Sequence, residues 1–127
     1  MDNTSTSTGI PNLGAMSDFV GEFEVSSRLT GQLYHCRFSH LWNAIATRHS
    51  DTVDTKFVVD GRRVIVGLAH TAFVQFTEKH GRSLSDREAS FVAAHYLRER
   101  LEQEDERPLH DVSAADVTRL IDMLGIQ

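Results

Sequence analysis

The dipeptide Asp60-Gly61 constrains this chain more than any other feature, because it separates two apolar runs. A type I′ turn requires positive φ at both central residues, which Gly adopts freely and Asp tolerates. A two-residue turn also fixes the register of the flanking strands, so Phe57 is predicted to pair with Val64. We therefore predict a β-hairpin over residues 55–68.

Side chains alternate along a strand, so the predicted hairpin has two different faces. The core face would carry the apolar residues Phe57, Val59, Val64, Val66 and Leu68. The other face would be mixed in character and would carry Lys56, Val58, Arg63 and Ile65. An isolated hairpin is marginally stable in water, so this one needs another strand, a helix or a second subunit.

The residues before the hairpin predict a tail, a strand and a helix. Residues 1–17 are rich in Ser, Thr, Asn and Gly, which predicts a disordered tail before a single domain over 18–127. Residues 19–29 alternate between apolar and polar, which predicts a third strand. Residues 33–48 predict a helix, because one side of a helical wheel gathers Tyr34, Phe38, Leu41, Trp42 and Ile45.

The residues after the hairpin predict helices. Residues 71–80 form the first, and Ser85 with Glu88 makes a capping box that opens a second helix ending near residue 103. Ser113 opens a last short helix. Together these elements predict an α+β fold, with a small antiparallel sheet of about three strands and three to four helices packed on one face.

Composition and charge narrow the classes of function. The chain has 127 residues, 40% of them hydrophobic, which suits one small domain. Its formal net charge of −5 argues against broad binding to nucleic acids or anionic membranes. No apolar run approaches the ~20 residues that span a bilayer, and no signal-peptide pattern opens the chain. With a single cysteine, Cys36, these features predict a cytoplasmic protein.

Three residues suggest a metal site. Cys36 and His40 are four residues apart, so they would be neighbours on the predicted helix. His70 follows the hairpin, where its second strand meets the next helix. Thiol and imidazole groups are the usual zinc ligands, so zinc is the metal these residues would hold. The same residues also fit a solvated polar surface, because no CxxC or HExxH spacing supplies further ligands. We identify no catalytic motif and no organic cofactor site.

The segment Leu84-Ser85-Asp86-Arg87-Glu88 resembles the opening of a LuxR-type helix-turn-helix. The resemblance covers five residues and implies a DNA-binding regulator. The predicted helix that follows is longer than in that motif, and no short turn comes after it. The last predicted helix, which would read the DNA, carries Asp116, Arg119 and Asp122 and is net negative, whereas a recognition helix needs donors for phosphates and bases.

Two surfaces are predicted to contact partners. On the helix predicted from Ser85 to about residue 103, Phe91 and Ala94 lie off the main apolar stripe, so we expect them at an interface. On the hairpin, the candidates are the apolar residues of the non-core face and the adjacent basic residues: Val58, Ile65, Arg62 and Arg63. Either surface could join two copies of the chain into a symmetric homodimer.

The sequence therefore favours a small cytoplasmic binding or regulatory module that acts through protein contacts and is not an enzyme. The first alternative is a metal-binding protein or metal-assisted enzyme that uses Cys36, His40 and His70. The second alternative is a DNA-binding regulator.

Overall fold

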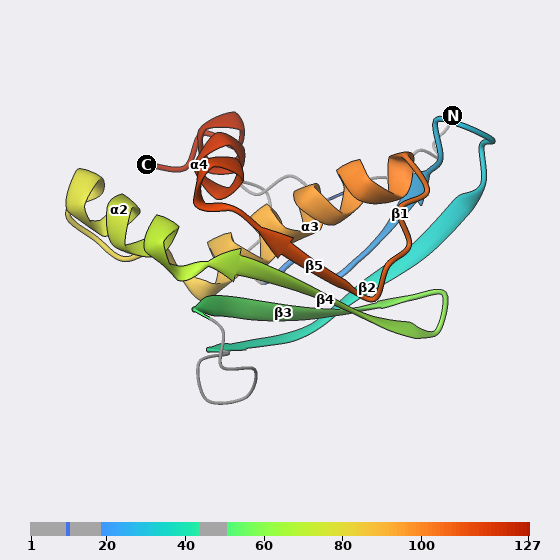
Figure 1. Ribbon diagram of the computed structural model, residues 1–127, viewed down its shortest axis with the longest axis horizontal. Coiled ribbons are helices and arrows are strands. Elements are labelled where there is room, and N and C mark those ends of the chain that lie inside the picture. The colour runs from blue at the N-terminus through green and yellow to red at the C-terminus, as the bar shows by residue number, and fades with distance from the viewer. Residues whose placement is uncertain (1–9, 11–18, 44–50) are drawn as a thin grey trace.

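The computed structural model describes residue 10, residues 19–43 and residues 51–127. In this part of the chain a five-stranded sheet carries three helices, all on one side (Figure 1). In chain order the elements are β1 (Glu22–Ser26), β2 (Leu33–Asn43), β3 (Thr52–Val59), β4 (Arg62–Ala69), α2 (His70–His80), α3 (Asp86–Glu102), β5 (Leu109–Val112) and α4 (Ala114–Met123).

The strands lie side by side in their sequence order, β1-β2-β3-β4-β5. The first four form antiparallel pairs, whereas β5 runs parallel to β4 after the chain has passed through α2 and α3. The fold is therefore α+β, as predicted, but its sheet is mixed and has five strands instead of about three antiparallel ones.

The hairpin prediction is confirmed. Phe57 pairs with Val64 in the antiparallel ladder between β3 and β4. Asp60 and Gly61 have φ angles of 49° and 81°, so both central turn residues lie in the left-handed region that a type I′ turn requires. Local turn chemistry has set the register of this strand pair.

The helix predicted over residues 33–48 is wrong, because residues 33–43 form strand β2. β2 pairs with β1 on one edge and with β3 on the other. Tyr34 and Cys36 are buried and alternate with exposed neighbours, as a strand requires. The residues that fitted a helical wheel are mostly aromatic or otherwise favoured in strands, and pairing on both edges decides between the two structures. Residues 44–48 lie outside the described part of the chain.

The strand predicted over residues 19–29 is confirmed as the shorter β1, in which Phe23 and Val25 face the core. Its neighbour is β2, so it is not the third strand directly beside the hairpin. Of the predicted tail over residues 1–17, the structure describes only Ile10. That side chain is half-buried and packs against the core, and the rest of the tail lies outside the described residues.

Strand β5 was not predicted. It has four residues, too few to establish a period, and it directly follows Pro108. His110 and Val112 are buried and face the core, paired with Val66 and Leu68 of β4. Parallel pairing joins residues distant in sequence, so only the tertiary structure reveals this strand.

Side chains and backbone conformation define the helix boundaries, and the predicted caps at Ser85 and Ser113 are present. Gly81 ends α2 in a left-handed conformation, with φ of 72°. The capping box of α3 is present, since the Ser85 hydroxyl accepts the Glu88 N–H at 3.1 Å and the Glu88 carboxylate accepts the Ser85 N–H at 2.9 Å. Ser113 caps α4 by accepting the Asp116 N–H.

Helix α3 forms the centre of the core. It packs against β1, β2, β4 and α4, so it is covered on more than one side. Its buried residues are Ala89, Ser90, Phe91, Val92, Ala93, Ala94, Leu97 and Leu101. The prediction that Phe91 and Ala94 form an exposed interface is therefore wrong, because both are 0% exposed. A helix with several packing partners buries residues outside a single stripe.

We expect Gly61→Val to lower the free energy of unfolding by roughly 1–3 kcal/mol, because a β-branched residue resists positive φ. Gly21→Val is the matched control, since a Cβ there meets no atom within 4 Å and its φ is not positive. Chemical denaturation of both variants measures the difference. Equal stability of the two variants would contradict the type I′ turn as the cause.

Candidate functional site

The three predicted metal ligands do not come together. Cys36 lies on the core face of β2, while His40 lies beyond a bulge on the same strand and is exposed. Four residues of strand span about 13 Å, far beyond the reach of a shared ion. His70 begins α2, two strands away. Within the described ranges no three His, Cys, Asp or Glu side chains are grouped so as to hold a metal.

The Cys36 thiol is in an environment that suppresses its reactivity. It is 3% exposed. Burial, together with the nearby Asp60 carboxylate, raises the pKa of Cys36 to about 12. Since the thiolate is the nucleophile, a thiol that stays protonated at neutral pH is a poor one. Cys36 is best described as a small apolar residue of the core.

The two histidines have local contacts instead of a shared site. His70 Nδ1 lies 3.9 Å from Asp51 Oδ1, and its ring stacks on Phe73 with 6.3 Å between centroids. His40 Nδ1 lies 2.9 Å from Ser39 Oγ, and its ring centroid is 5.0 Å from that of Trp42. Each imidazole therefore contacts residues next to it in sequence or at the same helix end, and the two do not form a common site.

Arg62, unlike the other basic residues predicted at the hairpin, forms an ion pair within the chain. It lies 3.3 Å from the Glu106 carboxylate, in the loop that joins α3 to β5. The same carboxylate accepts the Tyr34 hydroxyl at 2.5 Å. Burial and this hydrogen bond both raise the pKa of Tyr34. Arg62 and Glu106 thus help to fasten the loop to the sheet.

Glu104 fastens the same loop to the connection between β1 and β2. Its Oε2 accepts the hydroxyls of Ser27 and Thr30, both at 2.6 Å. These two hydrogen bonds lower the pKa of Glu104. The acidic segment before Pro108 is therefore engaged in intramolecular contacts and is not a free acidic patch.

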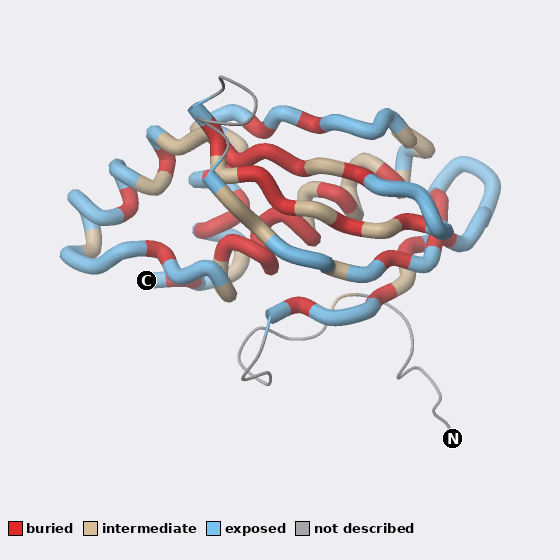
Figure 2. Tube along the Cα trace, turned by 90° about the horizontal axis from the view of Figure 1, so that it is seen from below, coloured by how far each residue is buried: buried red, intermediate tan, exposed pale blue. Residues whose placement is uncertain are grey.

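The remaining predicted partner residues lie together on the sheet face opposite the helices. Val58 pairs with Arg63 on one side and with Arg37 on the other, so these three form a row across β2, β3 and β4. Lys56 pairs with Ile65 in the next row on the same face. We call these five residues the basic sheet face. Figure 2 views the molecule from this side, where exposed and half-buried residues alternate with buried ones along the strands.

The cations of the basic sheet face differ from five other arginines of the described chain. Arg37, Lys56 and Arg63 have no ion-pair partner among the described residues. Elsewhere in those residues, five arginines each contact a carboxylate: Arg28, Arg62, Arg82, Arg107 and Arg119. The three cations instead surround Val58 and Ile65, which are half-buried.

Acidic residues border the basic sheet face. Glu22 lies beside Arg37 in the register of β1 and β2. Glu24, also on β1, has its Oε2 2.8 Å from His35 Nδ1. Asp111 lies on the opposite edge strand, β5. Asp54 alternates with Lys56 and Val58 along β3, so it belongs to the same side of the sheet, where it is buried. Positive charge is thus concentrated at the hairpin end of the three inner strands.

The sequence prediction placed Val58, Arg63 and Ile65 correctly on the non-core face but missed Arg37. Arg37 was assigned to a helix, where it has no relation to the hairpin. The alternation of Tyr34, Cys36 and Phe38 was the signal that could have placed it, because a strand at that register turns Arg37 outward.

Comparison with models of known protein families, with curated proteins and with solved structures finds no match. Inference about function therefore rests on the residues of this chain. None of the helices in its described part has the length and apolar character that crossing a membrane requires.

Two histidines lie away from the basic sheet face: His110 is buried, and His95 is half-buried. Burial lowers the pKa of His95 on α3 to about 4, and Arg98 adds to this effect. Burial also lowers the pKa of His110, although Asp105 opposes the shift. His95 Nδ1 and His110 Nε2 are buried without a hydrogen-bond partner in the described structure, so neither site provides an acceptor for an added proton.

We expect the free energy of unfolding to fall as the pH is lowered from 7 to 5. Unfolded histidine titrates near pH 6.5, so below that value the unfolded chain binds protons that the folded chain does not. For His95 the loss should continue until the pH approaches about 4. Denaturant titrations at pH 7 and pH 5 measure the change. A His95→Gln, His110→Gln double variant should lose most of the dependence, and an unchanged dependence would contradict this assignment.

Proposed function

We propose that the protein is a binding module that uses the basic sheet face to recognise an acidic segment of another protein. The observation that supports this is the grouping of Arg37, Lys56 and Arg63 around Val58 and Ile65, without carboxylate partners in the described chain. The proposed role is binding and not catalysis, because this face offers charge and apolar contact.

Charge and apolar surface on this face have complementary roles. Three neighbouring cations create a positive potential that attracts carboxylates and orients them on approach. The half-buried Val58 and Ile65 provide apolar area that a partner side chain can cover. An acidic segment with one or two apolar residues fits both features.

The size of the face favours a short segment. The central strands β3 and β4 have eight residues each. With strands about 4.8 Å apart, the whole sheet face measures roughly 500–600 Å². Each partner in a standard protein interface buries about 800 Å². A linear segment needs less area than a folded domain, so it is the partner that we propose.

A protein partner is favoured over nucleic acid. The formal net charge of the chain is −5, and Glu22, Glu24 and Asp111 border the basic sheet face. A long polyanion would meet this acidic border, whereas a short segment would not. Single-stranded nucleic acids also need exposed aromatic rings for stacking. Trp42, on the same side of the sheet, is half-buried and already contacts His40.

The other two functions considered have less support. Leu84 and Arg87, in the segment that resembles a helix-turn-helix, pack against the domain: Leu84 is buried, and the Arg87 guanidinium lies 5.4 Å from the Phe91 ring centre. In α4, Arg119 binds Glu99 through both terminal nitrogens, at 2.9 and 3.1 Å. The metal hypothesis loses its basis because Cys36 and His40 are not neighbours on a helix.

We expect a fluorescein-labelled peptide of 12 residues, with Glu and Asp flanking two central Leu residues, to bind the protein. Arg63→Glu should weaken this binding by roughly tenfold, because it removes one attraction and adds one repulsion at the centre of the face. Fluorescence anisotropy at low and physiological salt measures both affinities, and the affinity should fall as salt increases.

Lys79→Glu is the matched control, since it reverses an exposed side chain that, like Arg63, has no ion-pair partner among the described residues and that lies on α2, on the other side of the sheet. It should change the affinity by less than twofold. A peptide with Lys replacing the acidic residues tests whether binding requires negative charge. A 12-nucleotide oligo-dT tests whether the partner is a peptide or a nucleic acid. Equal weakening by both variants, or stronger binding of the oligonucleotide, would contradict the proposal.

The homodimer remains a prediction, and it now depends on the basic sheet face alone. If two copies associate there, Ile65→Lys should convert the dimer to a monomer, because it removes apolar contact and adds a fourth like charge beside Arg37, Lys56 and Arg63. Sedimentation equilibrium measures the mass of the protein in solution. A concentration of ~10 μM suits it, because weak interfaces have micromolar dissociation constants. A wild type that stays at 14.3 kDa at all concentrations would exclude this dimer.

A further inference from the structure

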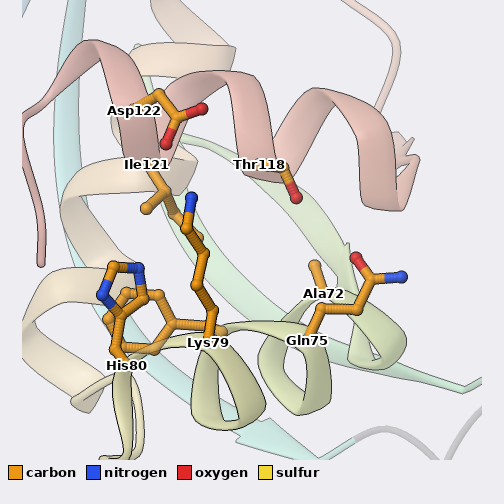
Figure 3. A pocket seen from close by; sticks show the side chains of 8 residues that line it. Ala72, Gln75, Lys79, His80, Thr118, Ile121 and Asp122 are labelled. Carbon is orange, nitrogen blue, oxygen red and sulfur yellow. The ribbon is translucent and has the colours of Figure 1, made fainter.

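Helices α2 and α4 lie side by side on the opposite side of the sheet from the basic sheet face (Figure 1). A groove lies between them (Figure 3). Its volume is about 190 Å³. Three buried apolar residues form the floor: Ala72, Phe76 and Ile121. Polar side chains from both helices form the rim, among them Lys79 and Asp122.

Two side chains hold Phe76, the aromatic residue of the floor, in place. The His80 ring packs on Phe76 with 4.3 Å between centroids, and the Arg82 guanidinium lies 5.1 Å from the Phe76 ring centre. Arg82 is itself fixed, because Glu88 binds it at 2.8 and 2.9 Å and the Gln127 carbonyl accepts from it at 2.7 Å. The Phe76 surface is therefore organised before any ligand arrives.

The volume of the groove sets the size of the ligand. A protein cavity of about 150 Å³ lined by apolar side chains accommodates benzene. The groove between α2 and α4 is somewhat larger, at about 190 Å³. It therefore has room for one aromatic ring or one branched aliphatic group, together with a small polar head at the rim.

The rim charges define that polar head. Lys79 extends from α2 toward Asp122 on α4, and the two groups have opposite charge (Figure 3). Neither has an ion-pair partner in the described part of the chain. A ligand that carries both a carboxylate and an ammonium group would satisfy both side chains while its apolar part covers Phe76 and Ile121.

We propose that this groove binds a small zwitterion with an apolar side chain, the chemistry of a free apolar amino acid. The carboxylate pairs with Lys79, the ammonium group pairs with Asp122, and the side chain lies on the floor. The ends of a peptide share only one of the two charges with this ligand, so the test separates the free amino acid from a peptide terminus.

Titration of the ¹⁵N-labelled protein with L-phenylalanine tests the proposal by NMR. A ligand of this size at ordinary ligand efficiency binds with a dissociation constant of about a millimolar, so ~10 mM suffices. Amide shifts are expected at Ala72, Phe76 and Ile121. N-acetyl-L-phenylalanine and L-phenylalaninamide each lack one charge and should bind at least fivefold more weakly. Glycine, which lacks the apolar group, should not bind.

Two variants of the rim residues show which side chain binds each charged group of the ligand. Lys79→Gln should abolish the preference for L-phenylalanine over its amide, and Asp122→Asn should abolish the preference over the N-acetyl compound. Glu78→Gln is the control, because Glu78 is exposed on α2 and does not line the groove. Melting temperatures show whether each variant is folded. Absence of shifts at ~10 mM, unchanged preferences in folded variants, or equal binding of glycine would overturn the proposal.

Discussion

The packing of α3 against the sheet is the constraint on which the rest of the structure depends. Small residues such as Ala89, Ala93 and Ala94 let the helix approach the strands closely, and Phe91 and Leu97 fill the space around them. Since α2 and α4 lie on the same side, the helices cover only one face of the sheet (Figure 1). No helix of the described chain covers the other face, so the binding that we propose there requires no rearrangement of the core.

The acidic loop between α3 and β5 explains how a chain with net negative charge presents a basic surface. Glu104 and Glu106 are occupied by Ser27, Thr30, Tyr34 and Arg62. Glu88 and Glu99 are occupied by arginines on the helical side. These contacts direct many carboxylates toward intramolecular partners. Lys56, Arg37 and Arg63 lie on the opposite side of the sheet, so the net charge of −5 does not describe the potential that a partner meets there.

The sequence predicts those parts of the fold that depend on neighbouring residues. The Asp60-Gly61 turn and the Ser85 capping box are short-range chemistry, and both are present. β2 was mistaken for a helix because the spacing of its large apolar residues fits both the helical and the strand period. Only the pairing with β1 and β3 decides for the strand. Phe91 was mistaken for a surface residue because the spacing of apolar residues does not show how many elements pack against a helix.

The same distinction applies to the candidate sites. Val58 and Ile65 could be placed on the non-core face from the hairpin alone, whereas Arg37 needed the register of β2. The groove could not be predicted, because Phe76 and Ile121 meet only when two helices distant in sequence pack together. The cations of the basic sheet face support no described ion pair, and Arg37 and Arg63 are exposed, so we expect the fold to depend little on them for its stability. Binding and stability should therefore respond to different substitutions, and a loss of affinity at this face can be interpreted without a loss of fold.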